Sequence, residues 1–242
     1  MSVAVLLPTY CEAENIESLI REIEDLNLDL TITVIDDSSP DGTADIARKL
    51  HEAYGNIHVI SRPEKLGLGT AITTGFRYML KQRRQPDYII TMDADYSHNP
   101  KDIPRLLETA KMGCDLAIGS RYVRGGSMVG WPLKRRMISR LANLIAALTV
   151  GAMFHDCTSG FRCYSKQYVK DVLPSLHSQT YEIQIETIRQ AHLNAFVVKE
   201  ISITFADRKR GKSKLTATEI RAFVTYIAKA TIGNLTSLSK RF

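Results

Sequence analysis

The 242-residue chain has little of what marks several protein classes. Its four cysteines (Cys11, Cys114, Cys157 and Cys163) form no CxxC pair and no metal-ligand spacing, which argues against a disulfide framework or a zinc site and favours a reducing, cytosolic setting. The longest uncharged stretch, 141–154, has 14 residues, fewer than the ~20 that a membrane-spanning helix needs. No basic segment precedes the short apolar run at 3–7, so we expect no signal peptide.

Acidic residues are outnumbered, with 26 Asp and Glu against 32 Lys and Arg, and the net charge of +6 predicts an anionic partner such as phosphate, nucleic acid or an acidic membrane surface. The excess gathers in two groups. The first basic cluster is Lys134, Arg135, Arg136 and Arg140; the second is Arg208, Lys209, Arg210, Lys212 and Lys214. Either cluster taken alone is also compatible with an ordinary solvated surface.

The first half of the chain alternates short apolar runs with amphipathic segments. We predict strands at 3–9, 31–37, 57–61, 88–92 and 116–120, and helices at 14–26, around 46–54, at 68–78 and after Pro100. This pattern predicts an α/β fold with a mostly parallel sheet covered by helices on both faces. Ligands of such sheets bind beyond the carboxyl ends of the strands.

After residue 125 the pattern loosens. We expect helices at 133–150, 181–192 and 216–238, and strands at 161–164 and 197–205. With no repeat and no long linker, the chain is predicted to be one domain, 1–242. It would comprise a nucleotide-sugar half (1–124), an acceptor-side half (125–215) and a C-terminal amphipathic helix (216–242).

Asp93-Ala94-Asp95 follows the predicted strand at 88–92. Two carboxylates at the end of a buried strand are costly to desolvate unless a cation neutralises them. A divalent metal that carries a diphosphate would do so, since Mg²⁺ and Mn²⁺ prefer oxygen ligands. The alternative is that these carboxylates only cap the next helix.

Several segments in one order resemble a known enzyme family. Those at strand ends are Pro8-Thr9-Tyr10-Cys11-Glu12, the acidic turn 36–43, Asp93-Ala94-Asp95 and Gly119-Ser120-Arg121-Tyr122. They resemble the family 2 inverting glycosyltransferases of the GT-A (Rossmann-like) fold. The later segments 130–139, 156–162, 182–186 and 207–214 look like the dolichyl-phosphate or polyprenyl-phosphate mannose synthase branch. The resemblance runs from residue 3 to about 215.

The resemblance implies a role for individual residues on the donor side. The nucleotide sugar would be bound by Pro8, Tyr10, Glu12, Ile35, Asp37, Asp93, Ala94, Asp95, Arg121, Arg208 and Lys214. Asp95, with Asp93 and Ser97, would hold Mg²⁺ or Mn²⁺. Cys11 departs from the asparagine usual at its place, and Ser97 from the glutamine often found there.

The acceptor phosphate would be bound by Arg121, Arg135 and Ser139, and these three with Asp95 are the predicted catalytic residues. Arg135 and Ser139 are four residues apart, so both can face one ligand from one helix. A lipid monophosphate is already an anionic nucleophile near neutral pH and needs no general base. We therefore expect His98, His155 and His192 to be structural.

The predicted reaction moves mannose from GDP-mannose to dolichyl or another polyprenyl phosphate with inversion to a β-linked product. One alternative keeps the fold but uses another donor, for example UDP-glucose with undecaprenyl phosphate. A remote alternative is a nucleic-acid-binding or nucleotidyl-transferring protein, which we do not favour because only Tyr122, Trp131 and Phe205 could offer stacking rings near the basic clusters.

The lipid acceptor predicts peripheral association with the cytosolic face of a membrane, directly or through a membrane-anchoring subunit. The candidate surface joins the first basic cluster, the apolar stretch 141–154 and the C-terminal helix. The alternative is that Leu144, Ile145 and Leu148 pack onto the core of the domain.

Overall fold

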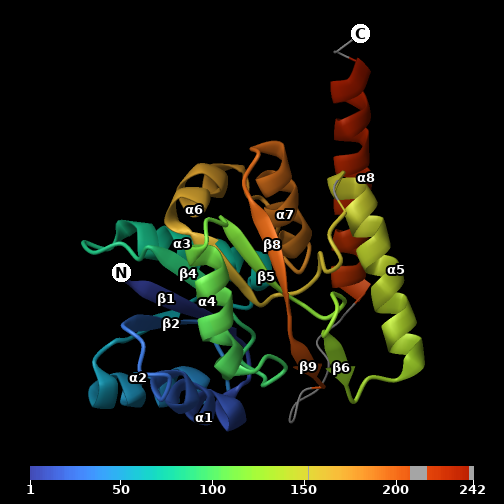
Figure 1. Ribbon diagram of the computed structural model, residues 1–242. Helices are drawn as coiled ribbons and strands as arrows, with labels where there is room; N and C mark the ends of the chain where they lie inside the picture. Colours follow the sequence, from blue (N-terminus) through green and yellow to red (C-terminus); the bar gives the residue numbers. More distant parts are fainter. Residues whose placement is uncertain (152, 208–216, 240–242) are drawn as a thin grey trace.

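The computed structural model describes residues 1–151, 153–207 and 217–239. A seven-stranded sheet forms its centre, with strand order β3-β2-β1-β4-β7-β5-β8 (Figure 1). Its strands are β1 (Val3–Thr9), β2 (Leu30–Asp36), β3 (Ile57–Ser61), β4 (Tyr88–Thr91), β5 (Leu116–Ser120), β7 (Arg162–Ser165) and β8 (Val198–Ser202). Only β7 runs antiparallel to its neighbours.

Helices cover both faces of this sheet. On one face lie α1 (Ala13–Glu24), α2 (Thr43–Tyr54) and α4 (Ile103–Lys111). On the other lie α3 (Leu68–Lys81), α5 (Leu133–Val150), α6 (Lys166–Val172) and α7 (Ile183–Leu193), with α8 (Ala217–Ser239) against α5. Two single 3-10 turns, η1 (Pro100–Asp102) and η2 (Leu173–Ser175), precede α4 and follow α6. The predicted mostly parallel α/β sheet, covered on both faces, is confirmed.

The apolar periodicity explains the two cores. In α1, Ile16, Leu19, Ile20 and Ile23 recur at helical spacing and are fully buried against the apolar strands β1 and β2. Each such side chain contributes about 2 kcal/mol through burial. Tyr54, the last residue of α2, is 37% exposed.

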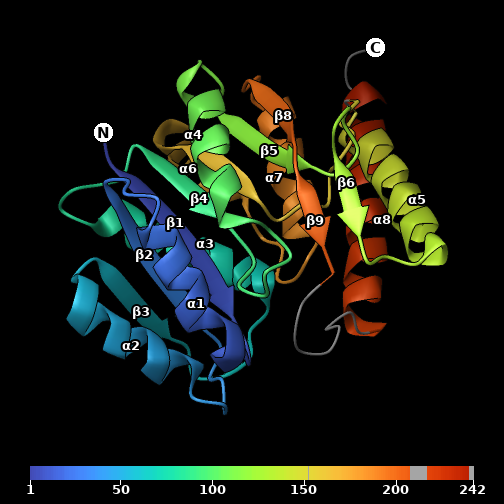
Figure 2. The same cartoon turned by 60° about the horizontal axis from the view of Figure 1, so that its bottom comes forward.

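The predicted strand at 197–205 is wrong in one respect, because the chain leaves the main sheet within it. β8 ends at Ser202, and β9 (Thr204–Ala206) pairs in parallel with the unpredicted strand β6 (Ser127–Val129) in a separate two-stranded sheet (Figure 2). Ile203 lies between them and is buried; its N–H donates to the carbonyl of Ser120 at 3.0 Å. Helix α6 was also not predicted.

The start of α3 packs closely against the loop that precedes α7. The amide of Gly69 donates to the carbonyl oxygen of Gln179 at 2.9 Å. A Cβ atom on Gly69 would lie 2.3 Å from the carbonyl oxygen of Ser178. Glycine is therefore required here by the close approach of two backbones.

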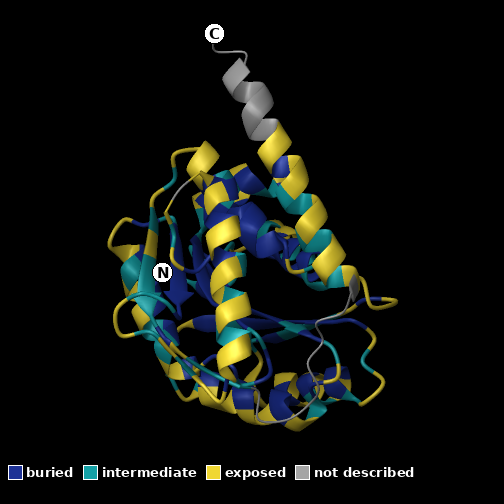
Figure 3. Cartoon of the chain, turned by 90° about the vertical axis from the view of Figure 1, so that its right-hand side faces the viewer, coloured by how far each residue is buried: buried dark blue, intermediate teal, exposed yellow. Residues whose placement is uncertain are grey.

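Helix α5 lies on the outside of the molecule with much of its length exposed (Figure 3). Leu144, Ile145 and Leu148 are 53%, 37% and 68% exposed, so the alternative that they pack onto the core is wrong. Ala146, Ala147 and Val150 provide the buried contact instead. Within the described ranges, no helix has both the length and the apolarity to cross a membrane.

Candidate active site

The loops that follow β1, β2 and β4 come together at one edge of the sheet. β1 is hydrogen-bonded to both other strands, in parallel, so the three carboxyl ends are neighbours. Each loop contains one non-glycine residue in the left-handed region: Cys11 (φ 57°), Ser38 (φ 53°) and Tyr96 (φ 61°). Such conformations cost about 1–3 kcal/mol and cluster at functional sites.

The acidic loop 93–97 follows β4 at this edge. Asp95 is 6% exposed and accepts a hydrogen bond from the Ser97 amide at 3.0 Å, while Asp93 is half-buried. The hydroxyl oxygen of Ser97 is buried and has no hydrogen-bond partner. An unpartnered buried oxygen beside two carboxylates fits a hard divalent cation.

The protein alone does not complete a metal cage here. The described residues contain no group of three or more His, Cys, Asp or Glu side chains placed to hold a metal. Mg²⁺ commonly takes one or two protein carboxylates and completes its shell with phosphate oxygens and water. The loop therefore fits a metal that is bound together with a phosphate-bearing ligand.

His98 lies fully buried behind this loop, and its Nδ1 atom accepts the Asp93 amide hydrogen at 3.2 Å. Burial lowers the pKa of His98 to about 4, with opposing contributions from nearby charges. The imidazole is thus neutral at neutral pH, and it stacks on Phe161 with ring centroids 5.1 Å apart. This environment suits the expected structural role.

The remaining predicted donor residues surround the ends of β1 and β2. The Lys65 ammonium lies over the Tyr10 ring, 4.5 Å from the ring centroid. Glu12 is buried and accepts from the Asn15 side chain at 2.9 Å. Pro8 is half-buried at the end of β1, Ala94 is buried between the two aspartates, and the side chain of Ile35 is fully buried within β2.

Asp37 has a buried cationic partner that the sequence analysis missed. The Arg62 guanidinium pairs with the Asp37 carboxylate, and both side chains are at most 7% exposed. The same carboxylate also accepts the amides of Leu66 and Gly67, at 3.1 and 3.2 Å. One sequence feature could have indicated this pair: Asp37 and Arg62 each directly follow one of two strands, β2 and β3, that are neighbours in the sheet.

Arg121 forms a buried two-point ion pair with Asp156. Its Nε and one terminal nitrogen each donate to a carboxylate oxygen of Asp156 at 2.7 Å, and Thr158 accepts a further bond at 2.6 Å. Burial by itself would raise the pKa of the Asp156 carboxyl, but the charge and hydrogen bonds of Arg121 outweigh it and lower that pKa. Asp156 is therefore ionised and held by Arg121, not available as a base.

Of the three predicted acceptor residues, Arg135 and Ser139 lie one turn apart on α5, whereas Arg121 follows β5. Arg135 is half-buried and pairs with Asp207 at 2.8 Å. Ser139 lies one turn further on, and its hydroxyl oxygen accepts the Tyr122 hydroxyl at 2.7 Å. Arg208 and Lys214, predicted to bind the diphosphate, lie outside the described residues.

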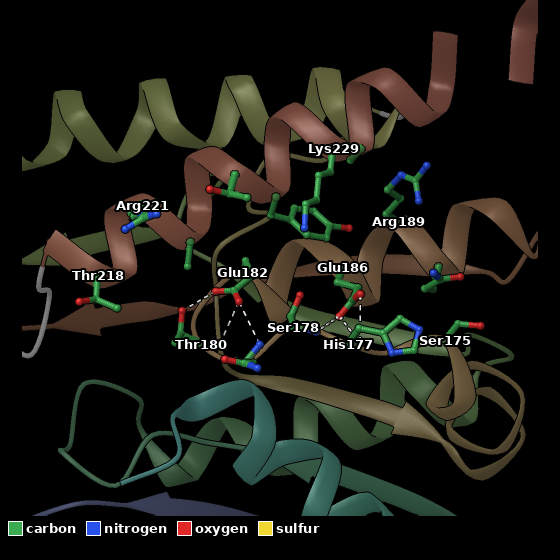
Figure 4. Close-up of a pocket in the computed structure, with 16 residues that line it drawn as sticks. Ser175, His177, Ser178, Thr180, Glu182, Glu186, Arg189, Thr218, Arg221 and Lys229 are labelled. Atoms are coloured by element: carbon green, nitrogen blue, oxygen red, sulfur yellow. Dashed lines mark hydrogen bonds between the residues drawn. The ribbon is translucent and has the colours of Figure 1, made fainter. Parts of the chain in front are cut away.

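A groove of about 900 Å³ lies between α8 and the loop before α7 (Figure 4). Below it, Glu186 accepts the amides of His177 and Ser178, at 3.1 and 2.9 Å, and Glu182 accepts the amides at 179 and 180, at 2.9 and 3.1 Å. These two glutamates of the 182–186 segment therefore hold the backbone of the loop.

Comparison with known proteins gives a family for this arrangement. Residues 4–173 match the family described as Glycosyl transferase family 2. The chain is 38% identical over 227 residues to the polyprenol monophosphomannose synthase of Mycolicibacterium smegmatis, covering 93% of this chain and 85% of that protein. It is 39% identical over 217 residues to the undecaprenyl-phosphate mannosyltransferase of Micrococcus luteus, covering 89% and 88%.

Solved structures share the fold at lower identity. Mannosyl-3-phosphoglycerate synthase from Rubrobacter xylanophilus matches with a TM-score of 0.58 at 18% identity, over 100% of this chain and 76% of that one. A mannosyltransferase from Pyrobaculum calidifontis, solved with GDP-Man and Mn²⁺, matches with a TM-score of 0.60 at 15% identity, over 98% and 74%. The chain is thus a glycosyltransferase that belongs to family 2, in the polyprenyl-phosphate mannose synthase branch.

Proposed function

We propose that this enzyme transfers mannose from GDP-mannose to a polyprenyl phosphate such as dolichyl phosphate, with a divalent metal and with inversion at the anomeric carbon. The observation that carries the proposal is the chain of contacts joining the acidic loop to the acceptor residues of α5. The Asp93 amide donates to His98, and the ring centroids of His98 and Phe205 are 5.3 Å apart. The Phe205 and Trp131 ring centroids are 5.4 Å apart. The Arg135 guanidinium carbon lies 4.0 Å from the Trp131 ring centroid.

The donor would lie over the ends of β1, β2 and β4. Tyr10 offers an aromatic face and Glu12 acceptor oxygens for a nucleoside, while Asp37 stabilises the adjoining loop through Arg62. Asp93 and Asp95, with Ser97, would hold Mg²⁺ or Mn²⁺, which when bound neutralises the diphosphate leaving group. Arg208 and Lys214 are proposed to assist there.

The acceptor would approach from α5. Arg135 would bind the lipid phosphate and Ser139 would donate a hydrogen bond to it. Arg121, whose charge is paired with that of Asp156, is proposed to line the same site. The phosphate oxygen attacks the anomeric carbon in line, the bond to the nucleoside diphosphate breaks, and the α-linked donor becomes a β-linked product. Since a phosphate monoester is already anionic, the residues need only position it and stabilise charge.

The relatives support the substrate class. The names of these relatives specify polyprenol, undecaprenyl phosphate and mannose, and the structure of the Pyrobaculum enzyme contains GDP-Man and Mn²⁺. We propose that the enzyme works peripherally at the cytosolic face of a membrane, either on its own α5 surface or with a membrane-anchoring subunit. No nucleic-acid partner is proposed.

A donor panel tests the reaction. Purified protein with farnesyl phosphate should release GDP from GDP-mannose in the presence of Mg²⁺ or Mn²⁺, and activity should disappear with excess chelator. Release of UDP from UDP-glucose, without turnover of GDP-mannose, would instead establish the alternative donor.

Asp95→Ala tests the metal assignment. Turnover should fall by at least about a hundredfold, because the carboxylate that holds the metal is lost, while the thermal midpoint stays close to that of the wild type. The matched control is Asp29→Ala, whose exposed carboxylate pairs with Arg84 on the surface. Near-normal turnover of the Asp95 variant at saturating Mn²⁺ would refute the assignment.

A further inference from the structure

Three aromatic rings surround the buried guanidinium of Arg121. The ring centroids of Tyr122, Trp131 and Phe205 lie 5.4, 5.6 and 5.3 Å from its central carbon. Because Arg121 is fixed by its two-point bond to Asp156, it provides a rigid point against which these rings pack. The three rings, hereafter the aromatic box, come from the end of β5, from the turn before α5 and from β9.

Two rings of the aromatic box each touch a different residue of the proposed acceptor site. The Arg135 guanidinium lies 4.0 Å from the Trp131 ring centroid, a distance typical of a strong cation–π contact. The Tyr122 hydroxyl donates to the Ser139 hydroxyl oxygen at 2.7 Å, which leaves the Ser139 hydrogen free to point elsewhere. Trp131 and Tyr122 therefore fix two side chains that are one helical turn apart.

Burial and charge make this arrangement more than surface packing. Trp131 is 8% exposed, and its indole N–H is buried without a hydrogen-bond partner. An unpaired buried donor is destabilising, because it has given up its hydrogen bonds to water without gaining a partner.

We propose that Trp131 and Tyr122 are positioning residues for the acceptor phosphate: Trp131 orients Arg135, and Tyr122 orients Ser139, both against the buried Arg121. The inference rests on the proposed function for the identity of the acceptor. In this arrangement Arg135 and Ser139 are already oriented before the phosphate head group of the acceptor binds, which lowers the entropy cost of binding.

Trp131 is the only tryptophan of the chain, so intrinsic tryptophan fluorescence reports on this site directly. Adding farnesyl phosphate to the wild-type protein should change the emission saturably, and farnesol, which lacks the phosphate, should not. The change should be lost in Arg135→Ala. No change with farnesyl phosphate, or an equal change with farnesol, would overturn the proposal. This titration requires no turnover, so it stands even if the donor is wrongly assigned.

Steady-state kinetics provide the second test. Trp131→Leu should raise the KM for farnesyl phosphate about tenfold, and Trp131→Phe, which keeps a ring under Arg135, by no more than about threefold. The KM for GDP-mannose should stay within about twofold in both. The matched control is Phe196→Leu, which removes a ring packed on Tyr168. An unchanged acceptor KM in Trp131→Leu, or an equal rise for both substrates, would contradict the inference.

A double-mutant cycle separates the role of Tyr122 from general stability. Tyr122→Phe keeps the ring against Arg121 but removes the bond to Ser139, and should raise the acceptor KM about threefold to fivefold. In a Ser139→Ala background the same change should have no further effect, because the group that Tyr122 orients is gone. Additive effects of the two substitutions would refute the link between them. If the wild type transfers no mannose while fluorescence still responds to farnesyl phosphate, the proposed reaction fails and the inference holds.

Discussion

At the scale of single residues, the Arg121–Asp156 ion pair is the contact on which the centre of the aromatic box depends. Both side chains are buried, and neither charge would be tolerated there alone. Glu200 fixes the segment that carries Asp156, since its carboxylate accepts the amides of His155 and Asp156 at 2.9 Å. Glu200 thus fixes the backbone at Asp156, and the Asp156 carboxylate in turn fixes Arg121, around which the three rings of the aromatic box pack.

Asp156→Asn should destabilise the fold by about 3 kcal/mol, because it leaves the buried Arg121 charge without its partner. The folded-state pKa of Asp156 is lowered, so the contribution of its carboxylate is complete above the unfolded value near 4 and is lost as the pH falls through the lower folded value. Urea denaturation at pH 7 and at a series of acidic pH values measures both effects. The difference in free energy of unfolding between the wild type and Asp156→Asn should become smaller below about pH 4, where the wild-type carboxylate begins to lose its contribution.

The control for this prediction is Asp45→Asn, which removes the partner of Arg48 in an exposed pair on α2. That change should cost less than about 1 kcal/mol. Equal losses in the two variants would show that burial of the Arg121–Asp156 pair is not what makes it matter.

At the scale of elements, α5 performs two tasks on different sides. Arg135 and Ser139 lie on the side that meets the aromatic box, while Met137, Leu141 and Leu148 are 63%, 59% and 68% exposed. A helix that is apolar on its solvent side is unusual without a partner. Its inner contacts hold the proposed acceptor residues Arg135 and Ser139, and its exposed apolar side is the surface that we expect to meet lipid.

The junction of α3 with the loop before α7 depends on two glycines, Gly67 and Gly69, whose Cβ atoms would lie 2.6 Å from the Gln179 carbonyl oxygen and 2.3 Å from that of Ser178. Gly69→Ala should lower the stability by about 2 kcal/mol or more, since the added methyl group would meet backbone that is hydrogen-bonded in place. Gly42→Ala is the comparison: its φ is +86°, but its Cβ would meet nothing within 4 Å, so only the left-handed backbone costs energy, about 1 kcal/mol. Urea midpoints compare the two, and equal values would show that close approach at Gly69 is relieved cheaply.

On the scale of the whole molecule, α5, which carries the proposed acceptor residues Arg135 and Ser139, runs along one flank with much of its length exposed (Figure 3). The first basic cluster begins the same helix, with Lys134 and Arg140 exposed. Basic side chains near anionic lipids contribute about 1 kcal/mol each and are screened by salt, and an apolar helix side adds shallow burial.

We expect the protein to float with vesicles that contain anionic phospholipid at low salt and to dissociate at high salt. Lys134→Glu with Arg140→Glu should weaken binding by at least about tenfold. The charge-matched control, Arg83→Glu with Arg84→Glu, changes exposed residues after α3 and should have little effect. Binding that is absent at every salt concentration would favour a membrane-anchoring subunit instead.

The sequence by itself determined most of the framework. Apolar runs such as 3–9 and 116–120, bounded by turn residues, predicted buried strands, and the periodicity of 133–150 predicted the bounds of α5, because these signals are local. The order of acidic and basic motifs at strand ends was also sufficient to indicate the family, which the comparisons confirm.

Only the tertiary structure decided which charges are partners and which faces are covered. Arg62 with Asp37, Arg121 with Asp156, and Trp131 with Phe205 join residues far apart in the chain, and no local pattern encodes such contacts. The division of 197–205 into β8 and β9 likewise depends on hydrogen bonds from Ile203 to β5 and from Ser127 to Ile203. Pairing and burial are set by the free energy of the assembled molecule, where a buried charge requires a partner and a strand needs a neighbour, and these conditions arise only when distant segments meet.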